Sequence, residues 1–328
     1  MKIDKKNSEL QNWNFNNNFK IKKLLKFDTN IKIKSYQYYS FPIGIISANT
    51  DYCNEILINK FTNIFMGENL QYYENEYFSW ENFIVKKIRA NKENLIDILI
   101  KYICNDYYIN ININEFFIKS RKAYKLKNVI HDCLIIGYDL NNKYLILVGN
   151  DKNGMLNKEF VDFNLFIKAT NFIDENVDLT LIKLKKNFKE ITNKEKLIKD
   201  LTEYFFAIEP RKRISFEDYN TFKFGIDAYK KFIEYYKDKS EFLINDIYFI
   251  YEQKYIFSKK LLFLFEQGII PEKVIEYYKI ILKKSEQIKN LYIKFFITKQ
   301  KKYIEKIKIK LNELLIIEIR ISKILSNN

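Results

Sequence analysis

The amino-acid sequence predicts an α+β protein, with strands and helices in its first part and a helical region at its end. Short β-branched segments separated by polar turns recur between residues 107 and 163. From about residue 190 onward, apolar residues recur at steps of three and four, which is the spacing of one helix face. Only 7 Gly and 3 Pro occur in 328 residues, which favours long regular elements, and 47% hydrophobic residues provide material for a packed core.

The first 104 residues are expected to contain a polar segment, strands and two helices. Residues 1–30 are polar and rich in asparagine, so we expect a loosely packed segment there. The stretch "IKIKSYQYYSFPIGIIS" (31–47) alternates and is rich in β-branched and aromatic residues, which predicts one or two strands. The cap-type sequence Asn-Thr-Asp then predicts a helix that begins near Cys53. Residues 79–104 are expected to form a strand or turn region and then a helix from near Lys92.

An antiparallel sheet is expected in the middle of the chain. The strand-like segments are 107–118, 129–137, 143–149 and 156–163. The last three form a meander, because turn residues separate them at Asn141-Asn142 and between Asp151 and Gly154. A helix followed by such a sheet is an α+β arrangement.

The remainder of the chain is expected to be a bundle of amphipathic helices. Gly268 is expected to close one helix and Pro271 to lie in the first turn of the next, and residues 300–325 form a last, lysine-rich helix. A change of pattern between about 185 and 195 places the domain boundary there. The expected parts are the polar segment 1–30, an α+β domain at 31–189 and a helical region at 190–328.

The chain is strongly basic. It carries 56 Lys and Arg against 41 Asp and Glu, a formal net charge of +15. Such a charge attracts acidic proteins, nucleic acid or anionic membranes. The basic residues are spread over both halves, and no zinc finger, helix-turn-helix or RNA-binding motif is recognisable, so we do not expect nucleic acid as the partner. A coding bias towards lysine accounts for the charge equally well.

Several classes of site are excluded. The glycine-rich nucleotide-binding motifs and the Gly-x-Ser-x-Gly motif are absent, and a single histidine rules out multi-histidine metal sites. The three cysteines, at 53, 104 and 133, form neither a disulfide framework nor a metal pattern. No apolar signal core and no stretch of 18 uncharged apolar residues occurs. We therefore expect a soluble cytoplasmic protein without cofactor, metal or membrane partner.

One set of residues could carry out nucleophilic chemistry. Cys53 is predicted in the first turn of a helix, where backbone N–H groups lower a thiol pKa from its usual value of about 8.5. His131, the only histidine, is predicted at the start of a strand and could act as base and acid. Asn150 or Asp151 follows the neighbouring strand and could orient the imidazole ring. Cysteine, histidine and then Asn or Asp is the chain order of papain-like enzymes.

Plainer interpretations of the same residues stay open. A lone cysteine is more often a small buried hydrophobe than a nucleophile. His131 could be an ordinary residue at a strand end, and Asn150 and Asp151 suit a simple hairpin turn. Cys133 is a rival nucleophile. However, it lies two residues from His131 on one strand, so their Cα atoms are roughly 6.6 Å apart with parallel side chains. This is a poor arrangement for a direct proton transfer between the two. Cys104, at a helix end, is the weakest candidate.

Residues 114–169 resemble a known family. The features are the aromatic "EFF", Tyr124, the strand "IHDCLIIGYD", a second strand after an Asn-containing turn, and the closing "VDFNLFIKA". They are similar to the cysteine-protease-like family typified by the N-terminal domain of butirosin biosynthesis protein H, whose standalone members accompany nonribosomal peptide and related thiotemplated pathways. The helical tail also looks like the tail of those standalone members.

The resemblance implies a papain-like fold for 31–189 and acyl-transfer chemistry. A cysteine would take an acyl group from the thioester of an acyl or peptidyl carrier protein and pass it to an amine or peptide acceptor, or to water. His131 matches the family's histidine, and Cys53 corresponds to the nucleophile by chain order and helix position. The flanks of Cys53 lack the small-residue pattern, and no upstream glutamine is evident, so Asn49 and the Cys53 N–H would form the oxyanion site.

From the candidate residues and the resemblance we expect a cysteine-dependent acyltransferase or amide-forming enzyme of specialised metabolism. Cys53 is the expected nucleophile, His131 the base and acid, and Asp151 or Asn150 the orienting group. The first alternative is a non-catalytic member that binds a carrier protein through its basic helical tail. A less favoured alternative is a basic protein that binds nucleic acid.

Overall fold

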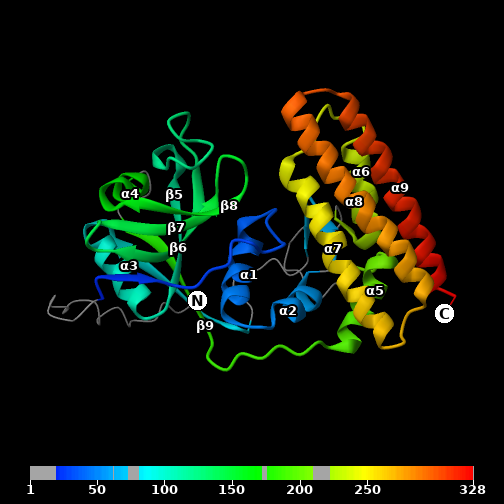
Figure 1. Ribbon diagram of the computed structural model, residues 1–328, viewed down its shortest axis with the longest axis horizontal. Coiled ribbons are helices and arrows are strands. Elements are labelled where there is room, and N and C mark those ends of the chain that lie inside the picture. The colour runs from blue at the N-terminus through cyan, green and yellow to red at the C-terminus, as the bar shows by residue number, and fades with distance from the viewer. Residues whose placement is uncertain (1–19, 62, 73–80, 172–175, 210–221, 328) are drawn as a thin grey trace. The chain divides into compact units, whose positions relative to one another are not determined.

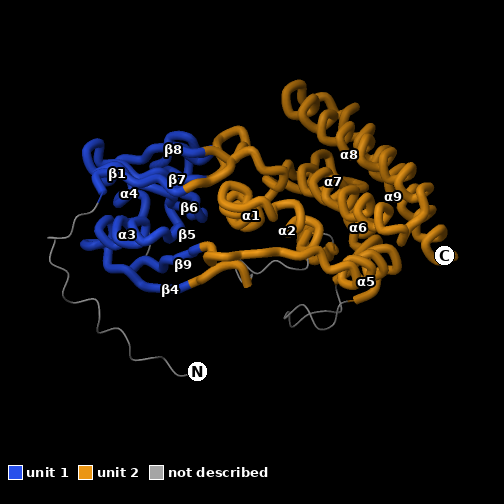
Figure 2. The backbone as a smooth tube through the Cα atoms, turned by 60° about the horizontal axis from the view of Figure 1, so that its bottom comes forward, with its two compact units in different colours: residues 1–25, 86–148, 158–183 blue, residues 26–85, 149–157, 184–328 orange. Residues whose placement is uncertain are grey.

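The computed structural model describes residues 20–61, 63–72, 81–171, 176–209 and 222–327. Most of the expected polar segment 1–30 therefore lies outside the described residues. The chain divides into two compact units, each built from several chain segments (Figure 2). Unit 1 comprises residues 1–25, 86–148 and 158–183, and unit 2 comprises residues 26–85, 149–157 and 184–328.

A seven-stranded sheet forms the centre of unit 1 (Figure 1). Its strands are β1 (Lys22–Leu24), β4 (Phe83–Asn91), β5 (Tyr108–Asn114), β6 (Ile130–Asp139), β7 (Tyr144–Asn150), β8 (Leu156–Asp162) and β9 (Asn176–Leu184). The strand order is β4-β9-β5-β6-β7-β8, and β1 also pairs with β6. The strands predicted at 107–118, 129–137, 143–149 and 156–163 are confirmed, as is the meander.

β6 is the central strand, and its residues from Cys133 to Asp139 are all buried. Its first half pairs with β5 and its second half with β1, both antiparallel. Gly137 permits this change of partner, because a Cβ atom there would lie 2.6 Å from the backbone oxygen of Lys23. A register shift between Ile135 and Gly137 in the pairing with β7 lies at the same point.

Two helices pack on the sheet of unit 1. α3 (Leu95–Cys104) packs on β5 and β6 through a face that includes buried Leu95, Leu99 and Ile103. It follows a short 3₁₀ turn, η2 (Lys92–Asn94), so the predicted helix start near Lys92 is confirmed. α4 (Phe163–Thr170) packs on β5 and on the 3₁₀ turn η3 (Glu115–Phe117), and Asp162 caps it by accepting from the Asn164 and Leu165 N–H groups.

Unit 2 begins with a helix where strands were predicted. The expected strand at 31–47 is wrong, because residues 37–49 form α1 (Gln37–Asn49). Every residue from Tyr39 to Ile46 is buried, so the helix has no polar face and the sequence shows no helical period. Gly44 allows the ring of Phe27 to lie against this helix, since a Cβ there would be 2.3 Å from the ring.

α2 (Cys53–Lys60) follows α1 directly and packs on helices from the C-terminal region. The helix predicted to begin near Cys53 is confirmed. A small antiparallel sheet, in the order β10-β2-β3, follows in the same unit. Its strands are β2 (Ile64–Met66), β3 (Leu70–Tyr72) and β10 (Lys223–Phe224).

The C-terminal helices make up the rest of unit 2 (Figure 1). They are α5 (Lys194–Phe205), α6 (Gly225–Tyr235), α7 (Ile244–Glu266), α8 (Glu272–Thr298) and α9 (Lys302–Leu325). α8 packs on both α7 and α9, which gives a three-helix bundle and confirms the helical region expected from the sequence. Gly268 has a positive φ of 69° just after α7, and Pro271 precedes the first residue of α8, as predicted.

Charged side chains are buried inside the helical part of unit 2. Lys254 on α7 donates to Glu318 on α9 at 2.6 Å and to the Tyr204 hydroxyl at 2.7 Å, and neither charged side chain is more than 1% exposed. Glu252, two residues earlier on α7, is also buried and accepts from the backbone N–H groups of Lys34 and Ser35. The carboxylate of Glu252 thus holds the segment before α1 onto α7.

Candidate functional site

Cys53 is the first residue of α2, as the sequence predicted, and its side chain is partly exposed. Burial raises the pKa of its thiol above the usual value. A hydrogen bond from Ser47 and the charge of Lys259 lower this pKa, whereas Asp28 and Glu55 raise it. The balance favours the neutral thiol at neutral pH, so the helix terminus alone does not make Cys53 a thiolate.

His131 is the second residue of β6 and is oriented by its neighbour in the sequence. Its Nδ1 lies 2.9 Å from Oδ1 of Asp132, and this pair raises the imidazole pKa, against a smaller opposing effect of burial. The side chain of His131 is 47% exposed. Asp132 was not predicted, because successive residues on a regular strand point to opposite faces and the sequence gives no signal that the two side chains meet.

Further charged groups surround this pair in unit 1. Arg121 and Glu159 form an almost fully buried ion pair at 2.7 Å, and Ser120 donates a hydrogen bond to Glu159. Burial raises the pKa of Glu115, and Arg121 and His131 lower it. Arg121 and Glu159 were not predictable from the sequence, because one arginine among 56 basic residues carries no signal of burial.

The two candidate orienting residues take part in local structure. Asn150 ends β7, and its N–H donates to Oε1 of Gln37 at 2.7 Å. Asp151 closes the hairpin turn before β8, since its Oδ1 accepts from the N–H groups of Asn153 and Met155. The Asp151 bonds are those of a simple hairpin turn, which is the plainer interpretation of Asn150 and Asp151 that the sequence left open.

Asn49, the candidate oxyanion residue, is the last residue of α1. Its side-chain amide donates to the Ile45 carbonyl oxygen at 2.7 Å and to that of Lys26 at 3.4 Å. Both bonds satisfy backbone carbonyl groups, one of them at the helix end. The amide protons that an oxyanion would require are thus committed to the backbone.

The predicted catalytic residues are divided between the two units. His131 belongs to unit 1, whereas Cys53, Asn49, Asn150 and Asp151 belong to unit 2. Within unit 2, the groups that shift the Cys53 pKa are Ser47, Asp28, Glu55 and Lys259.

The other two cysteines occupy structural positions in unit 1. Cys133 is fully buried on β6, and burial raises the pKa of its thiol strongly. The Sγ atom of Cys104, at the end of α3, lies 2.9 Å from the Tyr138 hydroxyl. Both resemble ordinary packed cysteines rather than activated nucleophiles.

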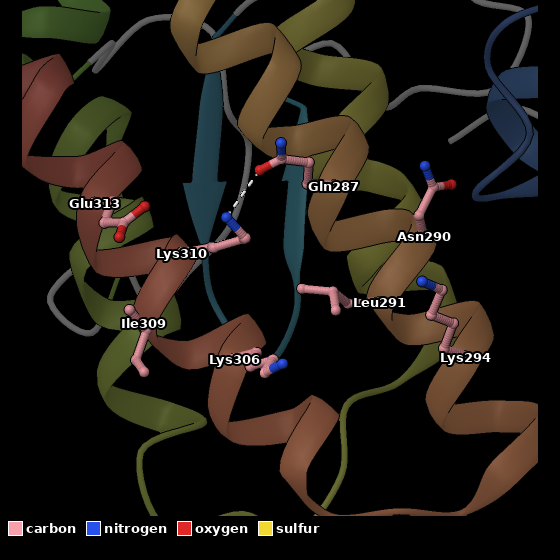
Figure 3. A pocket seen from close by; sticks show the side chains of 8 residues that line it. All are labelled: Gln287, Asn290, Leu291, Lys294, Lys306, Ile309, Lys310 and Glu313. Carbon is pink, nitrogen blue, oxygen red and sulfur yellow. Dashed lines mark hydrogen bonds between the residues drawn. The ribbon is translucent and has the colours of Figure 1, made fainter.

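A basic groove lies between α8 and α9 in unit 2 (Figure 3). It encloses about 580 Å³. Its lining residues are Gln287, Asn290, Leu291 and Lys294 from α8, and Lys306, Ile309, Lys310 and Glu313 from α9. No sequence motif indicated it, because it arises only when the faces of two helices meet.

The charges of the groove are unbalanced. Lys310 donates to Oε1 of Gln287 at 2.8 Å, a neutral partner (Figure 3). Glu313 accepts from Lys284, which lowers the pKa of this carboxyl and offsets its charge. Lys294 and Lys306 have no carboxylate within ion-pairing distance among the described residues. The groove is therefore cationic and open to an anionic partner.

The described residues form neither a metal-binding cluster nor a membrane-spanning helix. Among the described residues, no group of three or more His, Cys, Asp or Glu side chains could hold a metal ion. No helix in the described ranges is long and apolar enough to cross a membrane. Comparison of the sequence with protein-family models and with curated proteins gives no match.

Proposed function

We propose that this protein binds an acidic partner, of the acyl or peptidyl carrier protein class, in the groove between α8 and α9. The observation that carries the proposal is the cationic groove, which Lys294 and Lys306 line, while its one lining carboxylate among the described residues, Glu313, pairs with Lys284. Basic and concave surfaces attract acidic proteins by long-range electrostatics and then exclude water from the contact.

The distribution of charge along the chain supports this proposal. Residues 294–310 contain seven lysines and one glutamate, a net charge of +6 out of +15 for the whole chain. Glu305 pairs with Lys308 at 3.1 Å on the same helix turn. A coding bias would spread lysine evenly, whereas this hairpin collects two fifths of the net charge in 17 residues.

The state of the thiols favours binding over catalysis. A cysteine nucleophile attacks as the thiolate, and such sites hold a lowered thiol pKa. The pKa of Cys53 is raised instead, mainly by burial. We therefore place the non-catalytic member of the expected family ahead of the acyltransferase.

The test is a binding measurement with a purified acidic acyl carrier protein. The change K294Q/K306Q removes two groove charges, and K273Q/K279Q, at exposed positions of α8 remote in sequence from the groove, is the matched control. At low salt the groove variant should bind roughly tenfold more weakly, while the control should change less than about twofold. Affinity should also fall from about 20 mM to about 150 mM salt.

Two results would count against this proposal. Equal loss in the groove and control variants would mean that only total charge matters. Binding to a generic DNA duplex as tight as to the carrier protein would favour the nucleic-acid alternative, which predicts about one log unit of salt slope per phosphate contact.

Cysteine-dependent acyl transfer is the second candidate. It is favoured by the position of Cys53, which begins a helix, is partly exposed and is influenced by Lys259. In this mechanism Cys53 attacks a carrier thioester and the carrier thiol leaves, so that the acyl group becomes bound to Cys53. An amine or peptide acceptor then takes the acyl group and releases the Cys53 thiol, while His131 moves the proton in each step. Asp151 or Asn150 would orient the ring, and Asn49 would support the oxyanion only by giving up its hydrogen bonds to the Ile45 and Lys26 carbonyl oxygens.

Brief alkylation at mildly acidic pH, followed by peptide mapping, separates the two candidates. Acyl transfer requires that Cys53 is labelled before Cys104 and Cys133, and that His131→Ala slows this labelling. Carrier binding that is unchanged in Cys53→Ser, together with slow labelling of all three thiols, would support the non-catalytic role.

A further inference from the structure

The α8–α9 hairpin ends in a tight reversal. α8 ends at Thr298, and α9 begins at Lys302. Lys299 adopts a left-handed conformation with a φ of 56°, and its N–H donates to the Phe295 carbonyl oxygen at 2.7 Å. The residues that flank this reversal are therefore held in a defined conformation at the end of two long helices.

Three apolar side chains are exposed together at this end. Ile293, Phe296 and Ile297 are 39%, 53% and 74% exposed. Their spacing of three and four residues places them on one face of the last turns of α8. Single exposed apolar residues are common on soluble proteins, but a contiguous apolar stripe marks an interaction surface.

Lysines surround this stripe. Residues 287–304 contain five lysines and no Asp or Glu. Lys299, Lys301 and Lys302 are exposed in the reversal itself, and the Lys299 ammonium lies 4.5 Å from the centre of the Phe296 ring. We call Ile293, Phe296, Ile297, Lys299, Lys301 and Lys302 the hairpin tip.

The combination of groups in the hairpin tip selects one kind of surface. Exposed Phe and Ile beside several lysines is the composition of segments that insert into the headgroup region of anionic membranes. A nucleic acid would neutralise the lysines but leave the Phe296 and Ile297 side chains without a partner. An acidic protein fits the groove better than the tip. The groove offers lysines with little apolar surface, since Leu291 and Ile309 are its only apolar lining residues in the described part of the chain.

We propose that the hairpin tip binds reversibly to anionic lipid surfaces, with Phe296 and Ile297 inserted among the headgroups and the three lysines against lipid phosphates. This mode needs no membrane-spanning helix. The expectation of no membrane partner rested on the absence of an uncharged apolar stretch, which does not bear on a short interfacial tip. The inference does not depend on carrier binding in the groove, because none of the hairpin-tip side chains lines the groove, although the tip lysines add to the positive charge of the same helical hairpin.

The test is co-sedimentation of the full chain with vesicles of phosphatidylcholine, with and without about 30 mol% phosphatidylglycerol. The wild-type protein should bind only the anionic vesicles, and less at higher salt. Each lysine near an anionic surface is worth about 1 kcal/mol, or about fivefold, so K299Q/K301Q/K302Q should weaken binding roughly a hundredfold. F296S/I297S should weaken it at least about tenfold through lost insertion.

Matched controls exist on the same two helices. K273Q/K279Q/K283Q removes the same charge from exposed positions of α8, and I280S/I316S removes two exposed apolar side chains from α8 and α9. Both controls should bind anionic vesicles within about twofold of the wild type. Circular dichroism should show unchanged folding, as expected for exposed positions.

A second readout does not depend on loss of binding. Relative to the wild type, which contains two tryptophans, Ile297→Trp should add emission that shifts to the blue with anionic vesicles and not with neutral ones, because indole prefers the membrane interface. Absence of vesicle binding by the wild type would overturn the proposal. Unchanged vesicle binding in F296S/I297S would overturn the insertion of these side chains. Loss of carrier-protein binding rather than vesicle binding in the tip variants would reassign the tip to an acidic protein.

Discussion

Glu252 provides a quantitative test of how unit 2 is held together. Its Oε1 accepts from the N–H groups of Lys34 and Ser35 at 2.7 and 3.0 Å, and its Oε2 lies 3.2 Å from the Ser35 nitrogen. Burial raises the pKa of this carboxyl to about 7, although these hydrogen bonds and the Lys34 charge lower it. The folded state therefore binds a proton more tightly than the unfolded chain.

The sign of the pH effect follows from this difference. Stability contributed by protonated Glu252 is fully present below the unfolded pKa, which is about 4.5, and is lost as pH rises to the folded pKa. A shift to about 7 corresponds to roughly 3 kcal/mol lost over this interval, with no further change above it. Glu252→Gln removes the ionisation, so it removes this loss.

Urea unfolding of the wild type and Glu252→Gln between about pH 4.5 and about pH 8 measures the effect. At the acid end the variant should be less stable by about 1 kcal/mol, because glutamine has one acceptor oxygen fewer. At the alkaline end it should be more stable by about 2 kcal/mol, so the two stability curves should cross. Amide hydrogen exchange at Lys34 and Ser35 should follow the same pH dependence.

Glu266→Gln is the matched control, since Glu266 is an exposed residue at the end of the same helix. Its stability relative to the wild type should not vary with pH by more than about 0.5 kcal/mol. If the stability difference between the wild type and Glu252→Gln is likewise independent of pH, then burial does not raise the pKa of Glu252 in the folded protein.

Three further predictions concern buried charge, close packing and the single histidine. Lys254→Met should destabilise unit 2 by about 3–5 kcal/mol, because it leaves Glu318 buried without a counter-charge, whereas K254M/E318L should lie much closer to the wild type in thermal unfolding. Gly44→Ala should cost about 1–3 kcal/mol in the same assay, because its Cβ would overlap a neighbouring aromatic ring. The imidazole of His131, the only one in the chain, should titrate by NMR above the usual pKa of about 6.5, and Asp132→Asn should lower that pKa.

Each of these has a contrary outcome. A double variant at 254 and 318 as unstable as Lys254→Met would mean that the lost volume matters more than the charge. A neutral Gly44→Ala would mean that the Phe27 ring can move away. An unchanged His131 titration in Asp132→Asn would mean that the observed pair does not persist in solution.

The strands of unit 1 were predictable because their patterns are local. Segments such as 129–137 combine β-branched residues with flanking turn residues, and these features arise within a few positions. α1 was not predictable in this way, because a helix buried on every side carries no amphipathic period. The segment just before it is held by Glu252, more than 200 residues away in the sequence, and no local pattern could indicate that bond.

The candidate site was predicted only in part. Cys53 begins a helix and His131 lies near a strand start, as the sequence indicated. The pKa of Cys53 was not predictable, because Asp28 and Lys259 approach it only in the folded chain. The groove between α8 and α9 was not predictable either. The spacing of apolar residues shows which face of one helix is buried, but not which other helix packs against that face.

The order of synthesis gives the bond between Glu252 and Ser35 a further consequence. These residues are 217 positions apart, so at a translation rate of about 5–20 residues per second the ribosome needs roughly 10–40 s to make the second after the first. All segments of unit 1 are complete by residue 183, whereas the segment just before α1 must wait for Glu252 on α7. Until the rest of unit 2 has been made, the apolar residues that α1 buries in the folded protein lack part of their surroundings, and we expect a chaperone to bind them. A chain truncated after residue 189 would keep α1 in that exposed condition permanently, and we expect it to aggregate.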